Sequence, residues 1–456
     1  MKQKLLFMLF IIQLIIPQTS LADTVTVNNI TYETNDDDMT ASITGYSGDR
    51  PSGELILPNT ITSNDNEYTV TSIGSSAFKL CMLLTSIDLP DGLTKIGDEA
   101  FYFCSDLKSI DFPDGVTEIG NYAFFYCADI TSIDLPDGLT EISSSALMDC
   151  RSLTSITVSE NNSVYCSSDG VLFDKALTTL VIYPVGKTDT YYCVPNSVTE
   201  IGNASFCGCL SITSIDLPEG LTEIKEWTFA KCSSLTSIDL PKGVTKIGYN
   251  AFGYCNTLSS VVLPDGLTVI DSTAFHSCFS LTSIDLPNGL TEIGSYAFCS
   301  CSLTSIDFPE SLTEIGSSAF DFCSNLTDIK VNWEIPLTVT STEVFSTYAS
   351  ATLSVPVGTL EAYKADPYWG QFINIVEDSS LAVDKNLTDE TKLYVTNNGT
   401  LNISGAVDGV AVKVYNLNGG VVANGVVLDS TAQIELPITN GVYIVTIGNK
   451  SYKVIR

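Results

Sequence analysis

One block of residues recurs along most of this chain, and a fixed short period decides the architecture before any single residue is considered. Its consensus is Leu-Thr-Ser-Ile-Asp-Leu-Pro-Asp-Gly-Leu-Thr-Glu-Ile-Gly-x-x-Ala-Phe-x-x-Cys. The first isoleucine recurs every 23 residues, with one step of 22 and one gap of 59. It stands at Ile87, Ile110, Ile133, Ile156, Ile215, Ile238, Ile284 and Ile306, and Val261 and Ile329 share its phase. Such a repeat predicts a solenoid, in which each coil buries its apolar side against its two neighbours.

Residues 84–104 show how one coil is built. The apolar Ile87 and Leu89 alternate with polar residues, which is the period of a half-buried strand. Pro90 lacks an N–H and ends the strand, the Asp-Gly pair after it suits a corner, and the later Ala-Phe pair suits the core. We therefore expect a mainly β fold of the α+β kind, a solenoid of short parallel strands with 23-residue coils.

The Ile-Gly-x-x-Ala-Phe-x-x-Cys half of the repeat resembles the BspA-like leucine-rich repeats of bacterial surface proteins. Six stretches carry this resemblance: residues 73–81, 96–104, 119–127, 247–255, 293–301 and 315–323. The resemblance extends over about residues 24–376 and implies a leucine-rich repeat solenoid. It further implies an N-terminal cap at residues 23–54, repeats at residues 55–330 and a C-terminal cap at residues 331–378.

The 59-residue gap in the repeat is longer than two periods and reads as short strands separated by turns. It resembles the enlarged repeat pair of the same subfamily, so we assign residues 157–211 to enlarged coils. We expect these coils to continue the same sheet as their neighbours.

The two ends of the sequence differ from the repeats. Residues 1–22 combine two lysines with an apolar run and small residues before a cleavage site, which is the pattern of a secretory signal peptide. A retained membrane anchor is the alternative, but the run is short for a bilayer. Residues 381–456 contain about seven short strands between turns, which predicts a small β-sandwich. Motifs at residues 414–419, 441–444 and 453–454 resemble those of type IX secretion sorting domains, and a generic β module is the alternative.

The charge of the chain limits its partners. There are 53 acidic residues against 21 basic ones, a net charge of −32, which repels nucleic acid phosphates and anionic lipid. We therefore expect no nucleic acid partner, and the sequence after the leader contains no apolar run that could span a membrane. A surface of this kind attracts basic protein patches and binds cations weakly.

The 14 cysteines follow the repeat rather than a metal site. Ten occupy one phase of the coil: Cys81, Cys104, Cys127, Cys150, Cys209, Cys232, Cys255, Cys278, Cys301 and Cys323. One small apolar residue per coil predicts a buried, reduced packing row. We expect no metal site, because metal sites need close clusters of ligands and the chain has a single histidine. Cys166 and Cys193 are out of phase, 27 residues apart, and are the candidates for a disulfide after export.

Enzymatic activity is not expected. The single histidine, His276, occupies a variable position of the repeat and cannot by itself supply a catalytic triad. Carboxylates recur because the repeat recurs, and the sequence contains no phosphate loop or dinucleotide fingerprint. We therefore predict no catalytic residues and no cofactor.

The outward positions of the first strand are the candidate binding surface. Aspartates recur there, on what we expect to be the concave face, at Asp88, Asp111, Asp134, Asp216, Asp239, Asp285 and Asp307. Stacking like charges at the strand spacing costs about 1 kcal/mol per neighbour in water. Such a face is either fully solvated, without a ligand, or binds cations or a basic partner.

The resemblance implies a function in adhesion, because similar proteins are surface adhesins that bind host matrix proteins or other cells. We therefore expect a non-enzymatic, secreted or cell-surface binding protein that recognises proteins through the solenoid face. A structural component of the surface or matrix is one alternative. A glycan-binding surface protein is another, although the strands offer few aromatic side chains for stacking on sugars.

Overall fold

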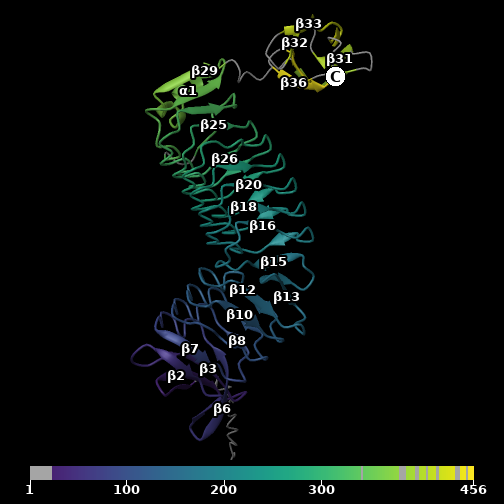
Figure 1. The fold of residues 1–456 in the computed structure, drawn as a ribbon. Coiled ribbons are helices and arrows are strands. Elements are labelled where there is room, and N and C mark those ends of the chain that lie inside the picture. The colour runs from purple at the N-terminus through teal and green to yellow at the C-terminus, as the bar shows by residue number, and fades with distance from the viewer. Residues whose placement is uncertain are drawn as a thin grey trace, which may run out of the picture. The chain divides into compact units, whose positions relative to one another are not determined.

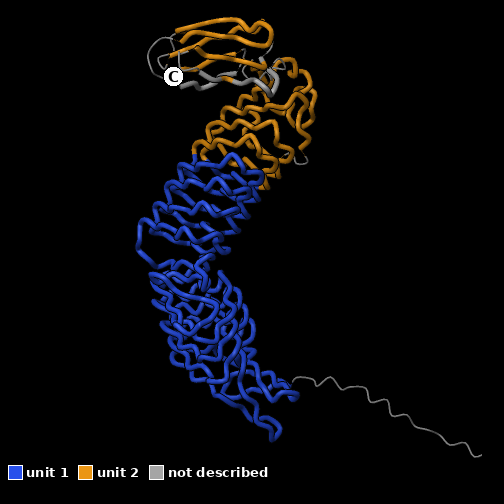
Figure 2. The backbone as a smooth tube through the Cα atoms, turned by 90° about the vertical axis from the view of Figure 1, so that its right-hand side faces the viewer, with its two compact units in different colours: residues 1–281, 296–301 blue, residues 282–295, 302–456 orange. Residues whose placement is uncertain are grey.

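The computed structural model describes residues 23–339, 343–378, 387–395, 400–406, 409–416, 421–436, 442–447 and 450–455. The expected signal peptide, residues 1–22, lies outside them. The chain divides into two compact units, which Figure 2 shows in different colours: unit 1 is Met1–Leu281 with Tyr296–Cys301, and unit 2 is Thr282–Ser295 with Ser302–Arg456. Among the described residues, no helix is long and apolar enough to cross a membrane.

Unit 1 begins with a small antiparallel sheet at the place of the expected N-terminal cap. Its strands are β1 (Asp23–Val27), β2 (Ile30–Asn35) and β3 (Thr40–Tyr46). β3 then pairs in parallel with β6 (Asn66–Ile73), which also forms a hairpin with β5 (Thr60–Ser63). Tyr32 and Ile43 from this sheet are fully buried, so the sheet covers the apolar side of the first coil.

The coils of unit 1 contribute two kinds of short strand, and both kinds pair in parallel (Figure 1). The first strands are β4 (Gly53–Ile56), β7 (Leu84–Asp88), β10 (Ser132–Leu135), β12 (Ser155–Val158), β18 (Ser214–Asp216), β20 (Ser237–Asp239) and β22 (Ser260–Val262). The second strands are β8 (Lys95–Ile96), β9 (Glu118–Ile119), β11 (Glu141–Ile142), β17 (Glu200–Ile201), β19 (Glu223–Ile224), β21 (Lys246–Ile247) and β23 (Val269–Ile270). Ile96 pairs with Ile119, and Ile133 with Ile156. The predicted solenoid of coils about 23 residues apart is confirmed.

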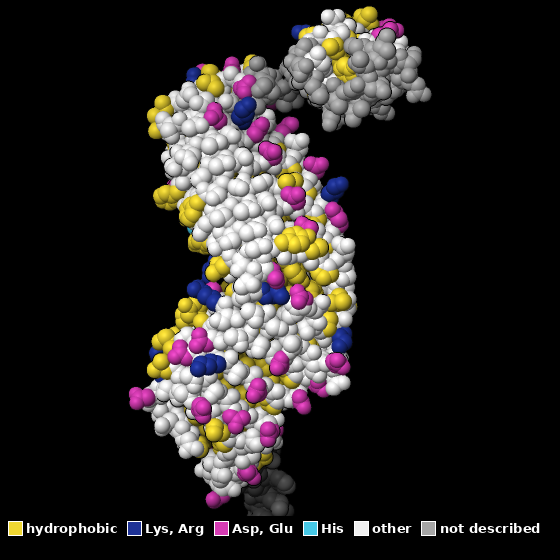
Figure 3. All heavy atoms as spheres, in the orientation of Figure 1, with side chains coloured by type: hydrophobic (Ala, Val, Ile, Leu, Met, Phe, Trp, Pro, Cys, Tyr) yellow, Lys and Arg dark blue, Asp and Glu magenta, His cyan; other side chains and the backbone are white. Residues whose placement is uncertain are grey.

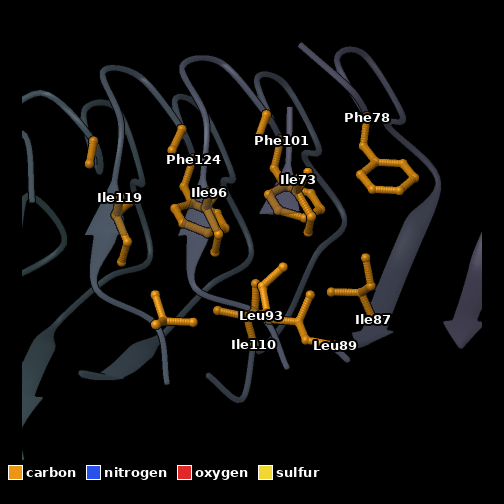
Figure 4. Packing of buried hydrophobic residues seen from close by; sticks show 14 of the residues in the cluster. Ile73, Phe78, Ile87, Leu89, Leu93, Ile96, Phe101, Ile110, Ile119 and Phe124 are labelled. Carbon is orange, nitrogen blue, oxygen red and sulfur yellow. The ribbon is translucent and has the colours of Figure 1, made fainter. Parts of the chain in front are cut away.

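Rows of like side chains fill the inside of unit 1, one member from each coil. Figure 4 shows a row of phenylalanines (Phe78, Phe101 and Phe124) and a row of isoleucines (Ile73, Ile96 and Ile119). All six side chains are at most 1% exposed. Neighbouring rings in the phenylalanine row stack with their centroids 5.4 and 5.2 Å apart. Each ring therefore packs against the coil before it and the coil after it, which is how a repeat without a core of its own becomes stable.

The enlarged segment pairs in parallel with the coil that follows it but not with the coils before it, so the expected continuous sheet is formed only in part. It forms β13 (Tyr165–Ser168), β14 (Val171–Asp174), β15 (Thr179–Ile182) and β16 (Tyr191–Cys193). β13, β14 and β15 pair antiparallel, and only then does β15 pair in parallel with β17. The reason is the tight turn at Asp169 and Gly170, both with positive φ, which reverses the chain within the segment. The row of second strands that runs from β6 to β11 therefore ends at this segment.

Unit 2 contains the last coils and their cap. β24 (Glu292–Ile293) pairs in parallel with β26 (Glu314–Ile315), so the single 22-residue step keeps the register. β25 (Ser305–Phe308), β27 (Asp328–Val331), β28 (Thr352–Pro356) and β29 (Asn374–Asp378) form a parallel sheet. The short α1 (Leu360–Ala365) and the 3-10 helix η1 (Trp369–Gln371) connect its last two strands. Trp369 is fully buried against Trp333 and Phe345, so aromatic rings close this end of the core.

The end of the chain forms the predicted β-sandwich. One sheet contains β30 (Leu387–Val395), β31 (Thr400–Ala406) and β34 (Thr431–Glu435), and the other contains β32 (Ala411–Asn416), β33 (Val421–Val426), β35 (Val442–Ile447) and β36 (Lys450–Ile455). Both sheets are antiparallel, and Leu401 and Ile403 of the first share one core with Val412 and Val445 of the second. Parts of the two motifs at 414–419 and 441–444 lie outside the described residues, and the sorting role stays a prediction.

Candidate binding surface

All seven predicted aspartates are exposed, and the isoleucine just before each of them is buried. Five lie on first strands: Asp88 on β7, Asp134 on β10, Asp216 on β18, Asp239 on β20 and Asp307 on β25. Asp111 and Asp285 occupy the same phase in coils where this stretch is not a regular strand. Strand alternation therefore places the carboxylates on the outside, as their sequence phase indicates.

The aspartates form short runs rather than one long row. The residue opposite Asp134 is Thr157, and the residue opposite Asp239 is Val262. In unit 2, Lys330 lies opposite Asp307, and its ammonium group pairs with Asp378 at 3.5 Å. Each interruption falls in a coil that departs from the consensus, so the like-charge repulsion between neighbouring carboxylates extends over two or three coils only.

Neutral hydrogen-bond donors contact several of the aspartates. The hydroxyl of Thr157 donates to Asp134, and the hydroxyl of Tyr191 donates to Asp216 at 2.6 Å. The bond to Asp216 raises the pKa of Tyr191 to about 12, because the carboxylate stabilises the protonated phenol. The amide of Asn332 donates to Asp307 at 2.8 Å. These donors fix the direction in which the carboxylates point.

A hollow of about 250 Å³ lies on this surface in each unit. In unit 1 it lies over β18 and β20, and its polar lining is Ser214, Asp216, Glu219, Ser237 and Asp239. In unit 2 its polar lining is Ser283, Asp285, Asn288, Ser305, Asp307 and Asn332. Both hollows thus present two aspartates and two serines from adjacent coils. An array of this kind can accept hydrogen bonds from an ammonium or guanidinium group, which are stronger than bonds between neutral groups.

The chemistry of the surface differs from that of a metal site. Within the described residues, no group of three or more His, Cys, Asp and Glu side chains is arranged to hold a metal ion. Cations can therefore only collect in the field of a few carboxylates, rather than enter a closed shell of ligands. The single histidine, His276, bonds through its Nδ1 with the hydroxyl of Ser277 at 3.0 Å, and burial lowers the pKa of its ring.

The ten in-phase cysteines are buried, as predicted, and their thiols form no disulfide. The structure adds a feature that the sequence did not suggest, since most of these thiols donate to the carbonyl of the Phe in the preceding coil. The thiol of Cys104 donates to Phe78, and that of Cys255 to Phe229, over 3.3 and 3.0 Å. Burial raises the pKa of Cys104 to about 12, so the thiol keeps its proton. Each of these carbonyls also accepts the backbone N–H of the cysteine in its own coil, so the thiol adds a second bond to it as well as filling space.

Cys166 and Cys193, the candidates for a disulfide, are not joined in this structure, and a disulfide after export stays a prediction. Both are free thiols, on strands that belong to different sheets, since β13 pairs with β14 and β16 pairs with β18. The thiol of Cys166 donates to the carbonyl of Asp174 at 3.2 Å. The 27-residue spacing suggested that the two cysteines lie one coil apart. Instead, the chain between them folds into antiparallel strands and does not complete one regular coil.

Exposed aromatic side chains are a second surface feature, which the sequence analysis missed. They lie in the tight turns that follow Ile-Gly in each coil, at the variable positions of the repeat. In unit 1 the most exposed are Tyr122, Tyr249, Tyr254 and Tyr296, at 38–45%. The sequence could have revealed them, because Tyr, Phe and Trp are abundant at these variable positions. The consensus leaves these positions undefined and so does not show this.

Comparison with known proteins supports the repeat assignment. A model of the "BspA type Leucine rich repeat region" matches in six copies, over residues 59–183, 189–282 and 245–363. The solved structure of the pneumococcal vaccine antigen PcpA is 19% identical, covers 79% of this chain and 100% of its own, and has a TM-score of 0.55. A leucine-rich cell surface protein of Faecalibacterium prausnitzii is 24% identical, covers 68% and 94%, and has a TM-score of 0.43. No curated protein matches.

The likeness to PcpA is a likeness of fold. The family model, in contrast, matches well over half of the residues. Its matched ranges contain the parallel strands, the phenylalanine row and the cysteine row described above. The chain therefore belongs to the BspA-type leucine-rich repeat family.

Proposed function

We propose that this protein is a non-enzymatic, adhesin-like binding protein of the bacterial cell surface, and that its aspartate-bearing first strands recognise a basic patch on a protein partner. The observation that carries the proposal is the repetition of the same hollow, with two aspartates and two serines, in both units. Family membership supports it, because repeat scaffolds of this kind present extended surfaces for binding.

The hollow in unit 1 suits a basic side chain. Asp216 and Asp239 come from adjacent coils, so a lysine or arginine from the partner can lie between two carboxylates. Ser214 and Ser237 add hydroxyl groups that accept or donate at the edge of the hollow. Since each contact is exposed to water, it contributes about 0.2–1 kcal/mol, and affinity arises from several such contacts along the coils.

A double substitution tests the surface directly. Asp216→Asn with Asp239→Asn keeps the shape of the hollow in unit 1 and removes two negative charges. We expect binding to a panel of immobilised matrix proteins, measured by biolayer interferometry with the full chain, to weaken about three- to tenfold. The difference should shrink as salt is raised above about 0.1 M, because exposed charges are screened over roughly 10 Å there.

The matched control removes the same charge from the second strands, through Glu141→Gln with Glu223→Gln. Both glutamates are exposed and lie outside the two hollows. If the control weakens binding as much as the aspartate variant, bulk negative charge explains the binding and the hollow is not a site. If no matrix protein binds, either at low salt or above about 0.1 M, the protein is a structural component of the surface instead.

We further propose that the protein is exported and then displayed on the cell surface. The signal-peptide pattern of residues 1–22 supports export. The motifs at 414–419, 441–444 and 453–454, which resemble those of type IX secretion sorting domains, support display. The β-sandwich at the end of the chain has a core of its own, as expected of a separable address module.

A further inference from the structure

The tight turns of unit 1 form a continuous edge, here called the turn ridge, which consists of residues 75–81, 97–104, 120–127, 143–150, 202–209, 225–232, 248–255, 271–278 and 296–301. Backbone hydrogen bonds between successive turns hold the ridge in register. The N–H of Phe103 donates to the carbonyl of Phe125 at 2.7 Å, and the N–H of Tyr126 donates to Met148 at 3.0 Å. Side chains at the same place in successive turns are therefore kept at a fixed spacing.

Six aromatic residues of the turn ridge adopt the left-handed backbone conformation. They are Phe103, Tyr122, Tyr126, Trp227, Tyr254 and Tyr296, with φ between 53 and 63°. This conformation costs a residue with a side chain roughly 1–2 kcal/mol, and glycine avoids the cost. Gly208 occupies the position equivalent to Phe103 and Tyr126, with φ of 80°, so the turn itself does not require an aromatic residue.

Three of the six rings gain little from the core in return for this strain. Tyr122, Tyr254 and Tyr296 remain 38%, 45% and 45% exposed. Ser76, Glu99, Asn250 and Thr273 adopt the same conformation at the position equivalent to Tyr122, so the turn imposes it on any residue and does not select an aromatic one. The aromatic residues of the ridge therefore point to a ligand rather than to the fold.

The rings gather in two patches. In the first, Tyr102 stacks on Phe125 at 4.8 Å and Phe103 stacks on Tyr126 at 4.5 Å, with Tyr122 edge-on to Phe125. The second contains Trp227, Tyr249, Tyr254, His276 and Tyr296. Between the patches, Met148, Ala204, Cys207 and Ala230 form an apolar cluster against which Phe125 and Trp227 pack. Figure 3 shows yellow side chains gathered along one edge, at the left of that view, with Lys and Arg side chains among them.

The charges along the turn ridge are nearly balanced, unlike those of the first strands, because the ridge has five acidic and three basic side chains and most of them are paired. Lys79 lies 4.5 Å from the centre of the Tyr102 ring and pairs with Glu99 at 2.5 Å. Arg151 lies 5.1 Å from the centre of the Tyr126 ring. Asp149 pairs with both Arg151 and Lys231, at 3.6 and 3.3 Å. In a protein with a net charge of −32, this edge is aromatic and carries only a small negative excess.

We propose that the turn ridge binds an uncharged polysaccharide. Sugar rings have an apolar C–H face and a rim of hydroxyl groups, which complement the face and the polar tip of tyrosine. A linear sugar polymer repeats along its length as the ridge repeats along the coils, so several weak stacking contacts add. Pairing of most ridge charges leaves only a small negative excess, which favours an uncharged ligand over an anionic one. This site is separate from the aspartate surface and does not depend on the proposed function.

Glycine substitutions separate a binding role from a structural one. The variant Tyr122→Gly, Tyr254→Gly and Tyr296→Gly removes three exposed rings and relieves the strain at the same positions. We expect its Tm to be unchanged or up to about 4 °C higher. Affinity electrophoresis of the full chain in gels containing soluble starch, yeast mannan or mixed-linkage β-glucan should show retardation of the parent protein by at least one. Retardation of the variant should fall at least fivefold, and heparin should retard neither protein.

The matched control is Tyr191→Ala, which removes a 52% exposed tyrosine that lies on β16 and outside the ridge. It should retain the retardation of the parent, as should the double variant of Asp216 and Asp239. The proposal is overturned if none of the three polysaccharides retards the parent, or if the control loses retardation as the glycine variant does. A fall in the Tm of the glycine variant would show that the rings serve the fold. Loss of a protein partner by the glycine variant, with no effect on polysaccharides, would assign the ridge to protein binding instead.

Discussion

At the scale of single residues, the cysteine row shows a side chain chosen for two properties at once. A thiol is small and apolar enough for the core, and its S–H can donate to a carbonyl that also accepts a backbone N–H. The thiol of Cys278 donates to Phe252 at 3.2 Å, and that of Cys301 donates to Phe275 at 3.1 Å, in the same way as in earlier coils. Alanine would lose the donor, and serine would place a more polar group in the same apolar surroundings.

The row predicts a loss of stability at alkaline pH. Burial raises the pKa of seven thiols of the row, which are Cys81, Cys104, Cys127, Cys150, Cys209, Cys255 and Cys278, and of Cys207 outside it. Unfolded thiols titrate near 9.0, whereas Cys81 titrates at about 11 in the folded protein. Because the folded pKa is the higher one, this contribution to stability is complete below pH 9 and is lost as pH rises towards the folded values. We expect the guanidinium midpoint to be flat from about pH 7 to 8.5 and to fall from about pH 9 to 11.

The control for this prediction is Cys127→Ala with Cys150→Ala, compared with the parent at each pH. The variant should be less stable at neutral pH, and its alkaline fall should be smaller, because two of the titrating groups are gone. Equal midpoints for the parent protein at about pH 7.5 and 10.5 would show that the thiols ionise alike in both states.

At the scale of elements, coil packing depends on rows that cross many coils rather than on any one strand. The second strands are two residues long and could not persist alone. The ring of Phe252 lies 5.4 Å from that of Phe229 and 5.2 Å from that of Phe275, so each ring stabilises the coils on both sides. Leu147 holds the Phe position in one coil and is only 2% exposed, so the row accepts a branched side chain.

Substitutions in the phenylalanine row should therefore show whether stability depends on the aromatic shape of the side chain or only on its volume. Phe252→Ala should cost about 3–5 kcal/mol of unfolding free energy, because it leaves a cavity next to two rings. Phe252→Leu, which places in this coil the side chain found at Leu147, should cost only about 1–2 kcal/mol. Chemical denaturation followed by circular dichroism measures both. Equal losses for the two variants would mean that the ring is not packed as described.

The repeat itself could be predicted because its phases leave one arrangement that buries Ile87, Leu89 and Phe101 together. The bond from Cys104 to Phe78 could not, because it joins residues 26 apart and depends on how one coil lies on the next. Short strands were predicted between residues 165 and 182, but their antiparallel pairing was not. No repeat constrains this segment, and the turn at Asp169 and Gly170 decides the direction of its strands. Of the candidate surface, the sequence predicted the exposure of the aspartates.

The interruptions in the aspartate runs and the turn ridge were not predicted, although both are encoded. The sequence shows that Val262 stands where other repeats have an aspartate. Its effect on the surface, however, depends on the parallel register that places it opposite Asp239. Left-handed backbone at bulky residues such as Tyr122 and Trp227 cannot be read from composition, because local preferences favour glycine there. Packing between coils overrides that preference in every turn of the ridge.

At the scale of the whole molecule, the chain separates binding surfaces from the module proposed to deliver them. The aspartate hollows and the turn ridge lie in the repeats, and the sandwich shares no core residues with them. A division of this kind lets one end of a chain determine its address while the coils determine its ligands.

Deletion of residues 381–456 should separate delivery from folding. We expect the shortened protein to cross the inner membrane and lose its signal peptide, but to be absent from the cell surface. Surface proteolysis of intact cells, followed by immunoblotting of cell fractions, measures this. The control is a chain that carries Asp216→Asn and Asp239→Asn with the sandwich intact, which should reach the surface normally. Normal display of the shortened protein would contradict the sorting assignment.

The buried thiol row also makes the lifetime of the fold depend on oxidants. While the coils are stacked, each thiol of the row is buried and out of reach, so oxidising surroundings leave it unchanged. Once a stretch of coils opens, many thiols are released together, in a chain flexible enough for any two of them to be joined by oxidation. Such crosslinks would block restacking, because every coil needs its own thiol back in the row. In oxidising surroundings we therefore expect unfolding of this protein to be irreversible. The lifetime of the folded protein is then set by the rate at which the coils open rather than by the free energy of unfolding.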